Sequence, residues 1–165
     1  MSDAGCQKSE VGKSGTLNLN LRSKRSRAAK PATAADVPRV YAIVAGQGDL
    51  PGALLASAGA IVPDTEGVVA LSNLDCPIIG LGAKLEQTVS GLRPGNVVIF
   101  TDMFGTSCAN AGREAKQRHP EIAVLCGTNL AMLVRFLYHR HKKPFAELIP
   151  FLVETGRTAV RTIEI

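Results

Sequence analysis

From residue 39 to the end of the chain, short apolar runs alternate with longer stretches in which apolar residues recur at helical spacing. Apolar runs closed by Gly or Asp are typical of buried parallel strands, whereas Leu and Ala at helical spacing indicate amphipathic helices. The pattern predicts strands at 39–45, 68–71, 96–101 and 122–126, and helices at 50–60, 82–92, 107–117, 130–139 and 144–155. The last segment, 159–165, alternates as an edge strand does.

This order of elements predicts one α/β domain with a mainly parallel sheet over residues 39–165. In such sheets the ligand crevice lies beyond the carboxyl ends of the strands, where the strand order reverses. We therefore expect three loops to meet there: 46–48, 102–107 and 127–129. Each precedes a helix and can offer backbone N–H groups, but strand-to-helix turns use Gly, Ser and Asn in any α/β protein. A single loop therefore says little about function.

The first 38 residues are predicted to form a disordered basic tail, because they are rich in Ser, Lys, Arg, Ala and Gly and show no sustained apolar period. Residues 1–40 carry eight basic and three acidic side chains, whereas residues 41–165 carry eleven of each. The net charge of +5 therefore lies within residues 1–40, almost all of it in the tail, and we expect no nucleic-acid binding except through the tail. Gly12-Lys13-Ser14 lacks the earlier glycine and the strand that a nucleotide-binding loop requires.

Composition bounds the class of protein further. With 45% hydrophobic and 20% charged residues the chain is typical of a soluble globular protein, and no stretch approaches the roughly 18 apolar residues of a membrane span. The four cysteines (Cys6, Cys76, Cys108 and Cys126) form no C-x-x-C pair and no cluster with His. This pattern predicts reduced thiols in a cytoplasmic protein, with neither a metal nor a cofactor.

Three segments carry a more specific pattern: VVIFTDMFGTSCAN at 97–110, AVLCGTNLAMLV at 123–134 and FAELIPFLVETGRTAV at 145–160. In order and spacing they closely resemble the mannose-family (type 4) EIIA domain of the bacterial phosphoenolpyruvate-dependent phosphotransferase system. With a weaker match at 41–58, the resemblance covers residues 39–165. It implies a doubly wound α/β domain, usually a homodimer, whose C-terminal edge strand, here 159–165, often crosses to the partner subunit.

The resemblance also implies a chemistry from which this chain departs. In the family, a histidine after the first strand receives a phosphoryl group from the carrier HPr and passes it to an EIIB domain, and an aspartate hydrogen-bonds that histidine. Asp102 matches the aspartate, but Gln47 stands at the histidine position. A glutamine can hydrogen-bond to Asp102, yet it cannot sustain reversible phosphotransfer, because its nitrogen lone pair is delocalised into the carbonyl.

The leading hypothesis is therefore a degenerate EIIA-like protein with a binding or regulatory role and without phosphotransfer. Its partners would be an HPr-like carrier, an EIIB-like domain or a regulatory target, with the basic tail as a second contact. We expect the crevice to bind through hydrogen-bonding groups that are not catalysts: Gln47, Asp102, Thr106, Ser107 and Asn129.

Two alternatives stay open. The first is an active phosphocarrier, in a sugar-uptake or regulatory phosphorelay, that uses Cys108 or a histidine. A helix N-terminus would activate the Cys108 thiol, although a buried, inert cysteine is the commoner situation, and the three histidines (His119, His139 and His141) are expected on the surface away from the loops. The second is a sensor of small anions that uses the helix N-termini. A receiver domain phosphorylated on Asp102 is set aside, because residues 45–48 lack the acidic pair that holds its metal.

Overall fold

The computed structural model describes residues 38–74, 76, 78–92 and 96–164. The chain divides into two units, 1–31 and 32–165, and every described residue belongs to the second. The predicted tail therefore lies outside the described residues, apart from Pro38. The elements of the described part follow in the order β1 (Tyr41–Gly46), α1 (Leu50–Ile61), β2 (Val68–Ser72), α2 (Ile78–Gly91), β3 (Val97–Thr101), α3 (Ser107–Arg118), β4 (Ala123–Cys126), α4 (Leu130–His139) and α5 (Phe145–Thr158). None of the helices described is long and apolar enough to cross a membrane.

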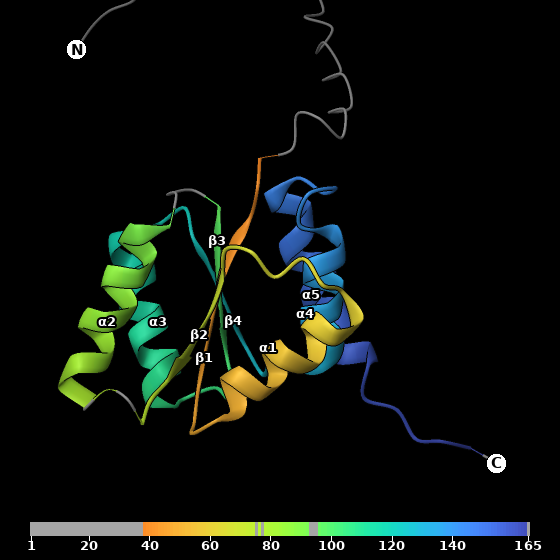
Figure 1. Ribbon diagram of the computed structural model, residues 1–165, viewed down its shortest axis with the longest axis horizontal. Helices are drawn as coiled ribbons and strands as arrows, with labels where there is room; N and C mark the ends of the chain where they lie inside the picture. The colour runs from red at the N-terminus through yellow and green to blue at the C-terminus, as the bar shows by residue number, and fades with distance from the viewer. Residues whose placement is uncertain (1–37, 75, 77, 93–95, 165) are drawn as a thin grey trace, which may run out of the picture. The chain divides into compact units, whose positions relative to one another are not determined.

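The strands form one parallel sheet in the order β2-β1-β3-β4. Helices α2 and α3 cover one face of this sheet, and α1, α4 and α5 cover the other (Figure 1). The predicted α/β domain with a parallel sheet flanked by helices is therefore confirmed. Because β2 and β3 lie on opposite sides of β1, the strand order reverses between β1 and β3, and the predicted crevice lies beyond the carboxyl ends of these two strands.

The two central strands are apolar on both faces because both faces are covered by helices. In β3, Val98 and Phe100 pack into the cluster that includes residues of α1, α4 and α5, whereas Val97 and Ile99 pack into the cluster formed with α2 and α3. All four side chains are fully buried. Successive strand residues point to opposite faces, so one five-residue strand supplies both halves of the core.

The C-terminal segment departs from the prediction. An edge strand was expected at 159–165, but α5 continues to Thr158 and residues 160–164 form neither helix nor strand. Val160 and Ile163 are almost fully exposed. A strand forms only when a neighbouring strand pairs with its backbone, and the folded part of a single chain brings no neighbour to this segment. Residues 160–164 thus form no strand in this single chain, and an edge strand that crosses to a partner subunit stays a prediction.

A buried arginine, Arg140, forms hydrogen bonds at the end of the domain opposite the carboxyl ends of the strands, near the turn between α4 and α5. The guanidinium of Arg140 is fully buried and donates to the carbonyl oxygens of Asp64 and Glu66 at 2.9 and 2.8 Å, and to Oδ1 of Asp64 at 2.8 Å. Burial by itself would raise the pKa of Asp64. The hydrogen bond and the charge of Arg140, followed by those of His141, outweigh burial and hold this pKa below its ordinary value. The end of α4 is thereby joined to the loop between α1 and β2.

Candidate functional site

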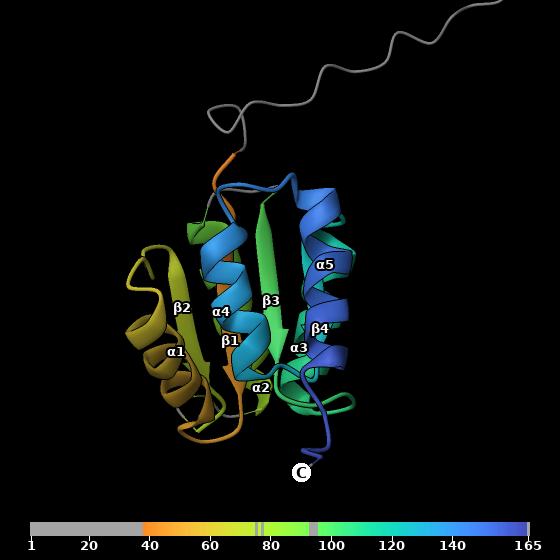
Figure 2. The same cartoon turned by 90° about the vertical axis from the view of Figure 1, so that its right-hand side faces the viewer.

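Asp102 lies directly after β3, and its carboxylate organises the crevice. Oδ2 accepts the backbone N–H of Gln47 at 3.0 Å, while Oδ1 accepts the backbone N–H of Met103 at 2.7 Å and the hydroxyl of Thr106 at 3.1 Å. Hydrogen bonds to an ionised carboxylate are among the stronger ones in proteins. One side chain therefore joins the loop after β1 to the loop after β3, at the reversal point of the sheet, which is the lower end of the strands in Figure 2.

The close approach of these two loops depends on Gly46. A Cβ atom at this position would lie 3.2 Å from Cβ of Asp102 and 3.4 Å from its carboxyl carbon. The 3.2 Å distance is shorter than ordinary van der Waals contact, and Asp102, which would have to move, is held by the hydrogen bonds to its carboxylate. A residue without a side chain at the end of β1 therefore sets the spacing between position 47 and Asp102.

The side chain of Gln47 does not take the partner expected of it. Only its backbone reaches Asp102, whereas its side-chain oxygen accepts a 2.8 Å hydrogen bond from Nδ2 of Asn73. Asn73 follows β2, and its Oδ1 accepts the backbone N–H of Gly48 at 2.9 Å. Sequence reasoning missed Asn73, because only the pairing of β2 with β1 brings the two loops together, and no motif in the chain signals that pairing.

Thr106 and Ser107 lie where α3 begins. Thr106 is the N-cap of α3, and its Oγ1 accepts the backbone N–H of Ala109 at 3.3 Å. Its single hydroxyl proton has two acceptors within reach, Oδ1 of Asp102 at 3.1 Å and the carbonyl oxygen of Met103 at 3.0 Å. Its hydroxyl thus ties the helix start to the crevice carboxylate. Ser107 is the first residue of α3 and is half-buried.

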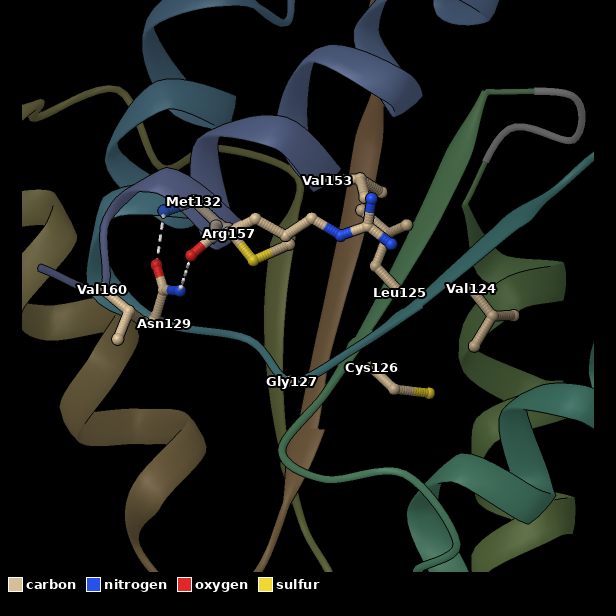
Figure 3. A pocket seen from close by; sticks show the side chains of 10 residues that line it. Val124, Leu125, Cys126, Gly127, Asn129, Met132, Val153, Arg157 and Val160 are labelled. Atoms are coloured by element: carbon tan, nitrogen blue, oxygen red, sulfur yellow. Dashed lines mark hydrogen bonds between the residues drawn. The ribbon is translucent and has the colours of Figure 1, made fainter.

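Asn129 belongs to a different part of this edge. It is the N-cap of α4, with Oδ1 accepting the backbone N–H of Met132 at 3.1 Å, and its Nδ2 donates to the carbonyl oxygen of Gly156 in α5 at 3.1 Å. It lines a groove of about 320 Å³ beside β4, together with Arg157 and Val160 (Figure 3). Thus Gln47, Asp102 and Thr106 share one hydrogen-bonded cluster with Asn73, whereas the oxygen and the amino group of the Asn129 side chain both bond on the α4–α5 side.

Exposed apolar side chains stand beside this cluster. Leu74 follows Asn73, and Met103 and Phe104 follow Asp102; their exposed fractions are 73, 62 and 86%. Exposed apolar side chains beside a polar cluster are available for contact with another protein. We call these three residues the apolar rim.

Cys108, His119 and His139 offer no nucleophile on the crevice surface. Cys108 is buried, which agrees with the expectation that a cysteine at this position is a buried one. Burial, followed by the charges of Asp102 and Cys76, raises the pKa of its thiol to about 11. His119 caps the far end of α3 and contacts Glu86 at 2.7 Å. His139 ends α4, and burial, followed by the charge of Lys143, lowers its pKa. Among the residues described, no three His, Cys, Asp or Glu side chains gather as a metal site would need.

Comparison with known protein families assigns the chain. Residues 42–153 match the family EIIA-man, described as the PTS system fructose IIA component. The chain belongs to this family. A search of curated protein sequences found no match.

Solved structures of EIIA proteins share the fold. The phosphotransferase system component EIIA from Streptococcus agalactiae superposes with a TM-score of 0.68 at 20% identity, covering 74% of this chain and 96% of that one. The mannose/sorbose-specific IIA subunit from Enterococcus faecalis gives a TM-score of 0.66 at 24% identity, covering 78% and 97%. A PTS IIA protein associated with the fucose utilization operon of Streptococcus pneumoniae gives 0.67 at 20%, covering 76% and 94%. At these identities the likeness concerns the fold.

Proposed function

We propose that this EIIA-man protein acts by binding and carries no phosphoryl group. The observation that supports this most directly is the residue at position 47, which on the resemblance is the phosphoacceptor position. It holds a carboxamide whose oxygen is engaged by Asn73. An amide nitrogen has no free lone pair with which to attack phosphorus, whereas an imidazole has one.

The partners we propose are proteins of the phosphotransferase system, an HPr-like carrier or an EIIB-like domain, or a regulatory target, and we place the protein in the cytoplasm with them. The apolar rim is the contact we assign to the partner, because Leu74, Met103 and Phe104 flank the cluster of Gln47, Asn73 and Asp102. In this reading Gln47 and Asp102 contribute hydrogen bonds at the centre of the interface, where water is excluded.

The decisive experiment is a phosphorelay incubation read by intact-mass spectrometry. The protein is mixed with phosphoenolpyruvate, the general phosphotransferase enzyme and HPr, alongside its Gln47→His variant. We expect the natural protein to keep its mass and the variant to gain one phosphoryl group on prolonged incubation. Phosphorylation of the natural protein would overturn the proposal, and mapping the modified residue would then identify the acceptor.

The alternative, an active phosphocarrier with another acceptor, is the weaker candidate. Cys108 is buried, and its raised pKa keeps the thiol protonated at neutral pH, so that little nucleophilic thiolate forms. A sensor of small anions is weakened by different observations. The N-termini of α3 and α4 are capped by Thr106 and Asn129, and the carboxylate of Asp102 would repel an anion at the centre of the site.

We further propose that two copies pair through the C-terminal segment, as the resemblance implies. β4 is an outer strand of the sheet, the groove beside it is partly apolar, and Val160 and Ile163 are exposed in a single copy. Light scattering after gel filtration tests this: Ile163→Asp should give a monomer, while Thr162→Asp, one residue away, should keep the dimer. A dimer in both variants, or a monomeric natural protein, would contradict the proposal.

A further inference from the structure

We propose that Asn73 is a positioning residue that determines which hydrogen-bonding face residue 47 presents to a partner. The residue lies outside the segments that carry the family resemblance. It follows the edge strand β2, and it contacts both the backbone and the side chain of the loop after β1.

The orientation of the Asn73 carboxamide is fixed by its surroundings. The backbone N–H of Gly48 points at one end of the amide at 2.9 Å, and a backbone N–H can only donate, so this end must be the carbonyl oxygen. The backbone N–H of Asn73 donates in turn to the carbonyl oxygen of Gly46 at 3.0 Å, which holds the residue against the loop. The amino group of Asn73 is therefore the end that faces residue 47.

A fixed donor beside residue 47 also fixes the carboxamide of Gln47. Its Oε1 accepts from Asn73 at 2.8 Å, and the amide is planar, so its amino group faces away from Asn73. Gln47 is exposed, and this amino group can only donate. Gln47 therefore offers an N–H donor to a partner, and the partner group that meets it must be an acceptor, such as a carbonyl oxygen.

The same donor opposes phosphoryl transfer even when an imidazole is restored. A neutral imidazole has one protonated nitrogen and one with a free lone pair, and the lone pair is the nucleophile. A donor can bond only to the lone pair. If the ring nitrogen beside Asn73 is the one that would attack phosphorus, Asn73 occupies its lone pair. If the other ring nitrogen faces the phosphoryl donor, Asn73 stabilises the tautomer in which that nitrogen is protonated. This consequence for phosphoryl acceptance rests on the proposed function, whereas the control of hydrogen-bonding direction does not.

The experiment compares Gln47→His alone with the same substitution combined with Asn73→Asp or Asn73→Ala. Asn73→Asp is the matched variant, because one carboxylate oxygen still accepts from Gly48 while the other now accepts where the amide donated. Ring ¹⁵N chemical shifts at about pH 8, where an ordinary histidine is neutral, report the tautomer. Asp49 and Asp102, the carboxylates on the neighbouring loops, are the same in all variants. Asn110→Ala, on the exposed side of α3, controls for loss of an asparagine elsewhere.

We expect Asn73→Asp to invert the tautomer of the imidazole and Asn110→Ala to leave it unchanged. Asn73→Ala should speed phosphorylation of the Gln47→His protein about fivefold to tenfold, the effect of one hydrogen bond. An unchanged tautomer in both Asn73 variants would overturn the inference. If the tautomer inverts but none of the imidazole variants is phosphorylated, the inference stands and the docking of relay proteins in the proposed function fails.

Discussion

The backbone N–H of Gln47 donates to the carboxylate of Asp102 at 3.0 Å, across a separation of 55 residues in sequence. The bond joins the ends of β1 and β3 at the point where the strand order reverses. The same carboxylate accepts a backbone N–H from its own loop and the hydroxyl of Thr106. It is therefore a structural anchor of the crevice in addition to any role in binding.

Asp102→Asn should lower stability although it preserves shape. Each carboxylate oxygen accepts a backbone N–H, so in either orientation the new amino group must face a donor. We expect the free energy of unfolding to fall by about 1–2 kcal/mol in urea denaturation. Asp49→Asn is the matched control, because Asp49 is exposed and makes no side-chain bond as the N-cap of α1. Equal effects of the two substitutions would contradict the anchoring role.

Gly46→Ala and Gly52→Ala should change stability in opposite directions. The methyl group at Gly46 would press on the anchored Asp102, and we expect a loss of about 1 kcal/mol or more. Gly52 lies in α1 with nothing within 4 Å of an added Cβ, so alanine should raise stability by about 0.5–1 kcal/mol through helix propensity. Thermal denaturation of both variants checks this. Stabilisation by Gly46→Ala would contradict a steric conflict between residue 46 and Asp102.

Arg140→Ala should be strongly destabilising. Its buried guanidinium joins α4 to two backbone carbonyl groups and the carboxylate of Asp64, and we expect a loss of about 3 kcal/mol. Arg135→Ala removes an exposed arginine from the same helix and should change stability by less than about 0.5 kcal/mol. Chemical denaturation distinguishes the two, and similar losses would mean that the Arg140 contacts contribute little.

Thiol labelling should separate Cys126 from Cys108. Cys126 is exposed, whereas Cys108 is buried with its pKa raised to about 11, so little thiolate is present near neutral pH. We expect iodoacetamide at about pH 8, the ordinary range of thiol ionisation, to modify Cys126 in the folded protein and to reach Cys108 only in denaturant. Peptide mapping by mass spectrometry reads both sites. Rapid native labelling of Cys108 would revive the thiol-acceptor alternative.

The acid limb of the stability curve should depend on Glu86. Its hydrogen bond with His119, followed by the one with Arg118, lowers the pKa of Glu86 in the folded state below the ordinary 4.5. The carboxylate thus contributes stability above pH 4.5, and this contribution is lost as the pH falls through the lowered value. Glu86→Gln should therefore be less stable than the natural protein at neutral pH, and the difference should shrink in acid. Glu154→Gln, on the exposed side of α5, should show no such trend.

Much of the fold could be predicted from the sequence because burial leaves a local pattern. The strands β1 and β3 are continuous apolar runs. Helix α4 is found at the predicted residues, because its N-cap Asn129 and its apolar residues are close together in sequence. Helix α2 starts four residues earlier than predicted, and α5 ends three residues later than predicted. Helix ends depend on which neighbours cover the last turn, and these neighbours lie far away in sequence.

The candidate site was only partly predictable for the same reason. Asp102 and Thr106 lie in one loop, so their contact follows from short spacing, and family membership agrees with the resemblance in the segments around them. Asn73 could not be found, since its relation to Gln47 exists only because β2 pairs with β1. Asn129 was assigned to the crevice from its place after β4, but its amide bonds to α4 and α5, which no spacing along the chain indicates.

The sequence by itself determined the α/β class, the order of the elements and the absence of an imidazole at position 47, because these depend on residue type and on periodicity within one segment. Tertiary structure decided what Gln47 contacts, which loops share the carboxylate of Asp102 and how Arg140 is paired. It also decided that residues 160–164 form no strand in a single chain. The contacts between Gln47 and Asn73, Gln47 and Asp102, and Arg140 and Asp64 join groups more than twenty residues apart in sequence. Hydrogen bonds act only over a few ångströms, so these contacts form only once the sheet has set the spacing.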